Sequence, residues 1–444
     1  MLNLSVLNDP GFCPHSLNKY ASIMACGNGY MGIRAAHEEN YTQQNRGMYL
    51  AGLYHRAGRN ETNELINVPD IIGMDIELDG INFTLLSGEI IDWQRELDFA
   101  NGELRRRVVW RSADGKRYRV ESRRFVSLDQ LPLVAMQLSV TPLDASSDVM
   151  LSTGIDATQT NSGRQHLDEI SVRVFDQHYM QGVYETQDRA ADVVISACCR
   201  LSTTSDSCFT AKNRRITVHH AVKVAQGDTV TLEKLVWVTH RSDKALSQDT
   251  FARNALAELK TCATRGYAAL LESAACAWKK VWHDCRVDVT STEHQDQLAL
   301  DYAVWHLTAM TPAHDERSSI AAKGLTGEGY KGHVFWDTEI SCCLSISLPD
   351  QKLPVVCCAT GGLTCRGRGK KHAGKAGLAP CSPGRVPRAV RKRRRNSQRS
   401  TSARAYVRKW PPRWLNIISW RISRGPLSPT GRQRTMMPLC AMKA

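Results

Sequence analysis

Alternating hydrophobic and polar residues mark the first half of the chain as rich in β-strands. Four stretches alternate or run apolar in β-branched residues: RYRVESRRFVSL (117–128), PLVAMQLSVTPL (132–143), ADVVISACCRLST (191–203) and DTVTLEKLVWVTH (228–240). Polar turns such as SADGK and AQGD separate them. Short strands at this spacing are typical of a large antiparallel sandwich. We therefore predict an N-terminal β-sandwich domain over residues 1–245.

The hydrophobic period changes at about Ser247. From there, large apolar residues recur at intervals of three, four and seven: Leu256, Leu259, Leu270, Leu271, Trp278 and Trp282. This spacing predicts helix, with an interruption at Gly266. A second amphipathic stretch, DQLALDYAVWHLTAM (296–310), carries Leu298, Tyr302 and Trp305 on one face. We predict a helical linker over residues 246–290 and the first helix of a helical domain within residues 291–340.

The chain changes character again after Ile340. It holds 58 Lys and Arg against 44 Asp and Glu, a formal charge of +14. Residues 341–444 alone carry +22 with one acidic residue, Asp350, whereas residues 1–340 carry −8. The segment 341–444 shows no helical period and no sustained strand alternation. It should therefore form no packed core, and we predict a disordered basic tail.

Membrane and redox features are sparse. No apolar run approaches the roughly 18–20 residues of a membrane helix, and MLNLSVLNDPGF lacks the features of a signal peptide. The cysteines of residues 1–340 form no CxxC pair: Cys13, Cys26, Cys198, Cys199, Cys208, Cys262, Cys276 and Cys285. This pattern favours reduced, mostly buried thiols over a zinc site or disulfides. We expect a cytoplasmic protein with no membrane partner and no metal.

Two glycine motifs fit the GxGxxG pattern of dinucleotide-binding proteins. They are GNGYMG (27–32) and GEGYKG (327–332). Neither lies in a strand–turn–helix unit, since IRAAHEE follows the first and HVFWDTE follows the second. The patterns therefore favour tight turns and close backbone approach over nucleotide binding.

Five motifs, in one order along residues 1–340, resemble glycoside hydrolase family 65, the maltose and kojibiose phosphorylases and their hydrolase relatives. They are GNGYMGIR, the block RGMYLAGLY…NELINVPD, LDFANGELRRR, SRRFVS and GEGYKGHVFWDTE. The resemblance implies a β-sandwich, a helical linker and an (α/α)6 barrel whose loops hold the substrate. It also implies an enzyme, often a homodimer, that cleaves an α-linked glucose disaccharide with inversion. Inorganic phosphate would be the co-substrate, β-glucose 1-phosphate and glucose the products, and no cofactor is implied.

The resemblance places Trp336 and Asp337 of FWDTE in the sugar site. An indole face stacks on a pyranose ring, and a carboxylate accepts hydrogen bonds from two neighbouring hydroxyls. Taken alone, the same residues could equally be a barrel-core aromatic and a helix N-cap. His333 and Glu339 are better explained as supporting or structural residues.

The family's catalytic glutamic acid should come from a motif that these 444 residues do not contain. Residues 341–444 hold no glutamate, so this chain has no assigned catalytic residue. Read one nucleotide earlier, the sequence after Ile340 can be given permitted codons that yield a helical pattern and then FPWES, which resembles the family's next sugar-site motif; degeneracy often leaves the first base of a shifted codon open. We therefore interpret residues 341–444 as an out-of-frame translation of a truncated enzyme, and we expect this chain to be inactive.

Three other functions stay open. The parent enzyme could be an α-glucoside hydrolase of the same family. RKRRR (391–395), with Tyr406, Trp410, Trp414 and Trp420 nearby, could be a nucleic-acid-binding arm, although its binding would be nonspecific. Finally, residues 1–245 alone could be a non-catalytic carbohydrate-binding module.

Overall fold

The computed structural model describes residues 6–291, 294–335 and 338. The predictions for Trp336, Asp337, Glu339 and the tail 341–444 therefore lie outside the described residues.

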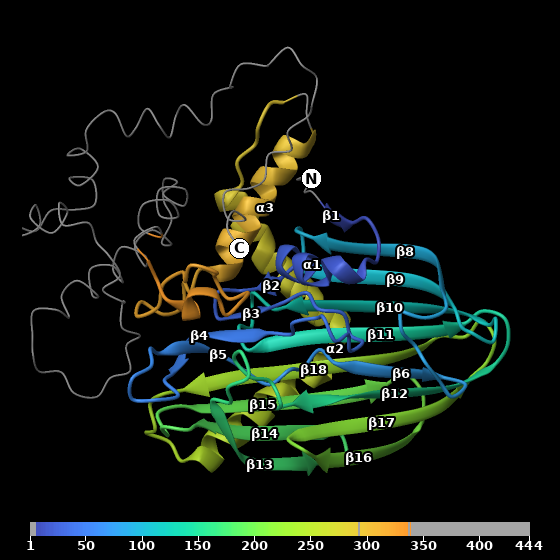
Figure 1. The fold of residues 1–444 in the computed structure, drawn as a ribbon, viewed down its shortest axis with the longest axis horizontal. Helices are drawn as coiled ribbons and strands as arrows, with labels where there is room; N and C mark the ends of the chain where they lie inside the picture. Colours follow the sequence, from blue (N-terminus) through green and yellow to red (C-terminus); the bar gives the residue numbers. More distant parts are fainter. Residues whose placement is uncertain (1–5, 292–293, 336–337, 339–444) are drawn as a thin grey trace, which may run out of the picture. The chain divides into compact units, whose positions relative to one another are not determined.

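The described strands form three antiparallel sheets (Figure 1). The large sheet has the order β1 (Val6–Asp9), β8 (Glu89–Asp98), β9 (Glu103–Arg111), β10 (Arg117–Val126), β11 (Leu133–Pro142), β18 (Val230–Arg241), β15 (Asp192–Leu201), β14 (Tyr179–Thr186) and β13 (Leu167–Phe175). A second has the order β16 (Asp206–Lys212), β17 (Arg215–Val224), β12 (Ser147–Asp156), β6 (Met74–Leu78) and β7 (Ile81–Asn82). A small one has the order β2 (Cys26–Gly27), β3 (Met31–Ile33), β4 (Met48–His55) and β5 (Glu64–Asn67).

Strand β18 shows why the large sheet is buried on both faces. Successive side chains of a strand point to opposite faces. Val236 and Val238 enter the main core, which also contains Leu151 and Val218 of the second sheet. Leu235 instead joins a separate core with helix residues. The sheet thus packs against another sheet on one side and against a helix on the other.

The helix on the outer face is α2 (Gln248–Cys285), which runs behind the large sheet in Figure 1. Its N-cap is Ser247, whose hydroxyl accepts a hydrogen bond from the Thr250 amide at 3.2 Å, as capping serines do. Gly266 breaks the helical geometry with φ of 74°. The other described helices are α1 (Leu17–Ile23), α3 (His294–Met310) and the 3₁₀ turns η1 (Pro14–Ser16) and η2 (Gly329–Gly332).

The turn between β8 and β9 receives the tryptophans of α2 and α3. Trp278 and Trp305 stack with ring centroids 4.2 Å apart, and the Trp282 indole donates to the Phe99 carbonyl at 2.7 Å. Gly102 has φ of +75°, and a Cβ there would lie 2.5 Å from Trp278 Nε1. The motif LDFANGELRRR therefore contains the turn against which the tryptophans of α2 and α3 pack.

The predicted order of a β-sandwich followed by helices is confirmed. The last described strand ends at Arg241, and the first long helix begins at Gln248. Trp305 is buried and Leu298 and Tyr302 are partly buried against the main core, so their shared face is inward. Only half of the eight cysteines are buried, so the expectation of mostly buried thiols is met in part: Cys26, Cys198, Cys199 and Cys262 are buried, whereas Cys13, Cys208 and Cys276 are exposed. Burial raises the pKa of Cys199 to about 12. The barrel start and the tail stay predictions.

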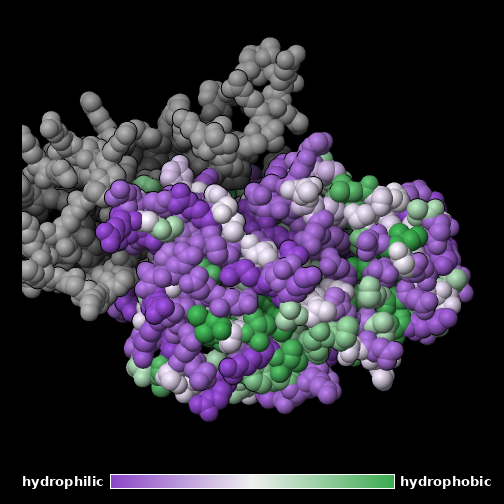
Figure 2. All heavy atoms as spheres, turned by 60° about the horizontal axis from the view of Figure 1, so that its bottom comes forward, coloured by the Kyte–Doolittle hydropathy of each residue, from purple (hydrophilic) through white to green (hydrophobic). Residues whose placement is uncertain are grey.

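Hydrophilic residues cover most of the face shown in Figure 2, with hydrophobic residues gathered in smaller areas between them. Single exposed apolar residues are normal on a protein surface. Ile170 and Val174 of β13 are examples, at 47% and 40% exposure. Within the residues that the structure describes, no helix is long and apolar enough to span a membrane.

Candidate functional site

The segment that leads to the predicted sugar-binding pair lies on the β-domain. Residues 311–335, here called the approach segment, connect α3 to Trp336 and Asp337. Leu325 of this segment joins a small core with Tyr49, Ala51 and Leu65 of β4 and β5. The small sheet is therefore the platform on which the approach segment rests.

Glycines allow the backbones of the platform and the approach segment to touch. The Gly29 amide donates to the Ala309 carbonyl at 2.8 Å. A Cβ at Gly29, where φ is +80°, would overlap the Thr311 carbonyl oxygen, and a Cβ at Gly32 would overlap that of Leu325. GNGYMG is thus a β-hairpin used for close backbone approach, as predicted, and no helix follows it.

Three polar side chains hold the approach segment at separate points. Arg34 donates to the Thr326 carbonyl at 2.7 Å and to Ser22 Oγ at 2.9 Å. Tyr54 donates to the Gly332 carbonyl at 2.7 Å. The buried His333 ring contacts the Asn63 carbonyl through Nε2 at 2.5 Å. His333 therefore anchors the segment, which fits the structural role expected for it.

The turn next to the predicted pair has an uncommon backbone. Tyr330 and Lys331 both have left-handed φ, 58° and 55°, a conformation that non-glycine residues seldom adopt and that often persists at functional sites. Lys331 Nζ lies 3.8 Å from Glu64 Oε1, which in turn lies 3.3 Å from His166 Nε2. Just past the pair, the Thr338 hydroxyl donates to the Ile320 carbonyl at 2.9 Å. Both sides of residues 336–337 are thus tied to surrounding structure.

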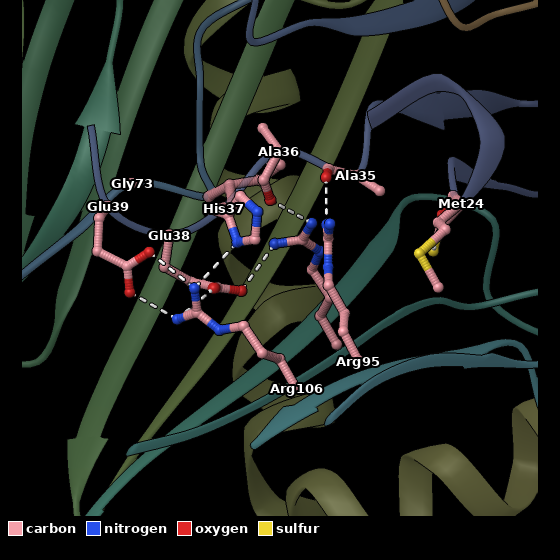
Figure 3. Close-up of polar contacts among 12 residues, drawn as sticks. Met24, Ala35, Ala36, His37, Glu38, Glu39, Gly73, Arg95 and Arg106 are labelled. Atoms are coloured by element: carbon pink, nitrogen blue, oxygen red, sulfur yellow. Dashed lines mark hydrogen bonds and ion pairs between the residues drawn. The ribbon is translucent and has the colours of Figure 1, made fainter. Parts of the chain in front are cut away.

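A buried charge cluster joins strands of the large sheet to the segment after β3; Figure 3 shows Glu38, Glu39, Arg95 and Arg106 of it. It consists of four arginines and four carboxylates: Arg46, Arg95, Arg106, Arg124, Asp9, Glu38, Glu39 and Asp70. Arg106 binds Glu39 through both terminal nitrogens at 2.5 and 2.7 Å and lies 3.0 Å from Glu38. Arg124 binds the other Glu38 oxygen at 2.8 Å. Burial would raise the pKa of Glu38, but Arg106 and Arg124 outweigh it and lower the pKa to about 2.

The cluster also fixes the backbone of residues 35–39. Arg46 donates to the carbonyls of His37, Glu38 and Glu39 at 2.7–2.9 Å and binds Asp70 at 2.8 Å. Figure 3 shows the Arg95 side chain reaching the Ala35 carbonyl. Because residues 35–39 continue directly from β3, the cluster holds the base of the glycine hairpin.

This cluster has no space for a sugar. The cavity beside it, lined by Asp9, Phe12, His37 and Arg95 among others, measures about 10 Å³, which is about one water molecule. Burial and the neighbouring arginines hold the pKa of His37 well below its usual value. We assign the cluster a supporting role for the platform.

Aromatic rings link β18, the hairpin and the approach segment. Tyr30 stacks on His240 with centroids 5.6 Å apart and meets His314 edge-on at 5.3 Å. Burial lowers the pKa of His240 to about 4 and also lowers that of His314. Both rings are therefore held neutral at pH 7.

We expect the stability of the chain to fall as pH decreases from about 6.5 to about 4. Unfolded histidine takes up a proton near pH 6.5, whereas folded His240 does so only near pH 4, so the unfolded state binds more protons in this window. Each such histidine contributes a slope of up to about 1.4 kcal/mol per pH unit. Urea unfolding of the full chain at pH 7, 5.5 and 4.5 measures this slope of the unfolding free energy against pH. His240→Phe should reduce the slope and His283→Gln, at an exposed site, should not; equal slopes in all three proteins would contradict the assignment.

Gly29→Ala should destabilise the chain more than Gly115→Ala. Both glycines have positive φ, +80° and +89°, but no atom lies within 4 Å of a Cβ at Gly115. Each substitution incurs about 1–2 kcal/mol for the left-handed backbone. Gly29→Ala adds about 1–3 kcal/mol because its Cβ meets the backbone of Thr311. Urea unfolding compares the two, and equal losses would show that the hairpin does not contact the approach segment.

The sequence singled out the motifs but not the roles of most residues within them. Arg34 lies in GNGYMGIR, and Tyr54 and Glu64 lie in the block from 46 to 70. Membership of those motifs was the only feature of the sequence that pointed to these residues. Their contacts could not be predicted from it, because their partners are about 270 to 290 residues away along the chain. In the part of the chain that is described, no group of three or more His, Cys, Asp or Glu side chains could hold a metal ion.

Two family descriptions match the chain. "Glycosyl hydrolase family 65, N-terminal domain" matches residues 7–281, and "Glycosyl hydrolase family 65 central catalytic domain" matches residues 301–352. A solved structure, "Putative kojibiose phosphorylase from human microbiome", shares the fold with a TM-score of 0.74 at 19% identity, covering 81% of this chain and 48% of its own.

Curated relatives are similar over the same region. Kojibiose phosphorylase of Escherichia coli is 59% identical over 334 residues, 75% of this chain and 44% of its own length. Kojibiose phosphorylase of Halothermothrix orenii is 36% identical and nigerose phosphorylase of Lachnoclostridium phytofermentans 26%, over 76% and 73% of this chain. The chain spans 44% and 45% of the lengths of these two relatives. Since the N-terminal family match alone covers more than half of the sequence, the chain belongs to glycosyl hydrolase family 65.

Proposed function

We propose that this chain derives from an inverting phosphorylase that cleaves kojibiose, an α-linked glucose disaccharide, with inorganic phosphate. The observation that carries the proposal is the 59% identity to kojibiose phosphorylase of Escherichia coli. Phosphate would attack the glucosyl carbon from the face opposite the leaving oxygen, so an α-glucoside would give β-glucose 1-phosphate and glucose. Phosphate would be the co-substrate, and the mechanism needs no cofactor.

In this proposal Trp336 and Asp337 bind the glucosyl unit. The indole would cover one face of the ring, and the carboxylate would accept hydrogen bonds from two hydroxyls. The tethering of the approach segment by Arg34, Tyr54 and His333 supports this proposal, because it fixes the residues that lead to the pair. A substrate misplaced by about 1 Å can react about 100-fold more slowly. Hydrogen bonds that fix the segment next to the sugar-binding pair would therefore support the reaction.

We further propose that residues 341–444 are out of frame and that this chain lacks the general acid. The loss of acidic residues after Ile340 supports this, as does the fact that permitted codons in the shifted frame can yield FPWES. The catalytic-domain match stops at residue 352, shortly after the proposed break. The division into residues 1–245, 246–290 and 291–340, the cytoplasmic location and a homodimeric parent belong to the same proposal.

The test is to resequence the gene around the Ile340 codon and to express a version with the frame restored by one nucleotide. The product should convert kojibiose and phosphate to β-glucose 1-phosphate, which proton NMR identifies by its anomeric signal. Release of glucose alone would make the parent a hydrolase. An intact reading frame with no sugar turnover would overturn the proposal.

A further inference from the structure

A crevice of about 530 Å³ opens between helix α2 and the turn that joins β10 to β11. The turn contributes Asp129 and Gln130, the helix contributes Glu258 and Arg265, and β18 contributes Trp237. Its volume lies within the range of about 300–1,000 Å³ that small-molecule pockets occupy. None of these residues belongs to the approach segment or to the predicted pair at 336–337.

The polar atoms of the crevice have few partners of their own. Asp129 and Glu258 are exposed, and within the described residues their carboxylates accept no hydrogen bond and form no ion pair. Gln130 Oε1 accepts a hydrogen bond from the Cys262 thiol at 2.9 Å, which orients the amide and leaves its NH₂ group without a partner in the same part of the chain. The crevice thus presents two acceptors and a donor.

Trp237 gives the crevice a large aromatic surface. It is partly buried and packs against two hydrophobic cores, so the ring is held in place. Its indole N–H has no hydrogen-bond partner in the described part of the chain. A rigid aromatic ring combined with a few convergent polar groups is the arrangement that small polar ligands with an apolar face require.

The charges decide which ligand fits. Two unpaired carboxylates would repel a phosphate or carboxylate group, while the only guanidinium among these residues, Arg265, already donates to Ser273 Oγ and to the Ala269 carbonyl. An uncharged polyol avoids this repulsion, because its hydroxyls donate to carboxylates. Its ring can also lie against an indole.

We propose that this crevice is an accessory binding site for an uncharged glucose unit, free or at the end of a glucoside. The glucose ring lies against Trp237, its hydroxyls donate to Asp129 and Glu258, and the Gln130 amide donates to a sugar oxygen. The site is independent of the proposed catalytic function, since it is built from the β-domain and α2 alone.

The full 444-residue chain is titrated with glucose, maltose and glucose 1-phosphate by saturation-transfer difference NMR. Glu258→Gln should weaken glucose and maltose binding about tenfold, as the loss of a charged hydrogen bond would. Trp237→Phe should leave the protein folded but weaken the binding of both sugars. The control is Glu272→Gln, also exposed on α2 but outside the crevice, which should bind as the unaltered chain does. Asp337→Ala, which alters the separate sugar site of the proposed function, should retain the part of the binding that Glu258→Gln weakens.

Each alternative result overturns the inference. Absence of saturable sugar binding, or equal affinity in Glu258→Gln and Glu272→Gln, removes the site. Loss of binding in Asp337→Ala alone assigns the affinity to the predicted catalytic region. Tighter binding of glucose 1-phosphate than of glucose makes the crevice an anion site. None of these outcomes depends on whether the parent enzyme is a phosphorylase.

Discussion

No glucose 1-phosphate and no free glucose should appear when the 444-residue chain is incubated with phosphate and kojibiose, maltose, nigerose or trehalose. A positioned general acid typically contributes about 10²–10⁴ to the rate. In the proposed function this chain lacks that acid, and residues 341–444 contain no glutamate. Without the acid of the proposed function, the remaining rate should equal the background.

The measurement is proton NMR of the anomeric region over a day at pH 7, with the frame-restored protein as the positive control. Turnover by the 444-residue chain that Asp337→Ala abolishes would show that the catalytic residues lie within residues 1–340. Turnover that survives Asp337→Ala would point to a contaminating enzyme. Failure of both proteins would instead count against the proposed function.

Arg106→Met should destabilise the chain by about 3–5 kcal/mol, the usual cost of removing one partner from a buried ion pair. Arg106 is 2% exposed and pairs with Glu38 and Glu39, whose side chains are 6% and 5% exposed. Methionine fills most of the volume of the arginine side chain. It leaves the buried carboxylates of Glu38 and Glu39 without the positive charge of Arg106. Urea unfolding of the full chain gives the change in free energy.

Arg107 provides the matched control because it is the next residue of β9 and points to the opposite face. Its partner is Asp92, and the two side chains are 46% and 45% exposed. Exposed pairs contribute about 0–1 kcal/mol, so Arg107→Met should change stability little. Similar losses in the two variants would show that burial does not make the cluster important. Adding Glu39→Gln to Arg106→Met should recover part of the loss, since one uncompensated charge is removed.

Part of the fold follows from local patterns. The alternation around Val236 and the spacing of Trp278 and Trp282 specify strand and helix, because side-chain direction repeats every two residues in one and every 3.6 in the other. The order of elements follows in the same way, as does the family, since its motifs occur in sequence order. Burial on both faces of β18 could not be predicted from the sequence, because a run of apolar residues does not reveal which element covers each face of the strand.

The candidate site depended far more on tertiary structure. The sequence named Trp336 and Asp337 by resemblance and explained the glycines of GNGYMG as close-contact residues. It did not reveal that Gly29 meets Ala309, or that Arg34 holds Thr326. These contacts join residues that are about 280 to 290 positions apart, so no local periodicity encodes them.

The buried charges illustrate the same division. By itself, the sequence determined that AHEEN and LRRR are charged, which for most residues of these types predicts a solvent-exposed position. Only the tertiary structure decided that Glu39 and Arg106 are buried against each other. The physical reason is that burying a charge is costly unless an opposite charge or hydrogen bonds compensate for the lost water. Which partner arrives depends on how β9 lies against the segment after β3.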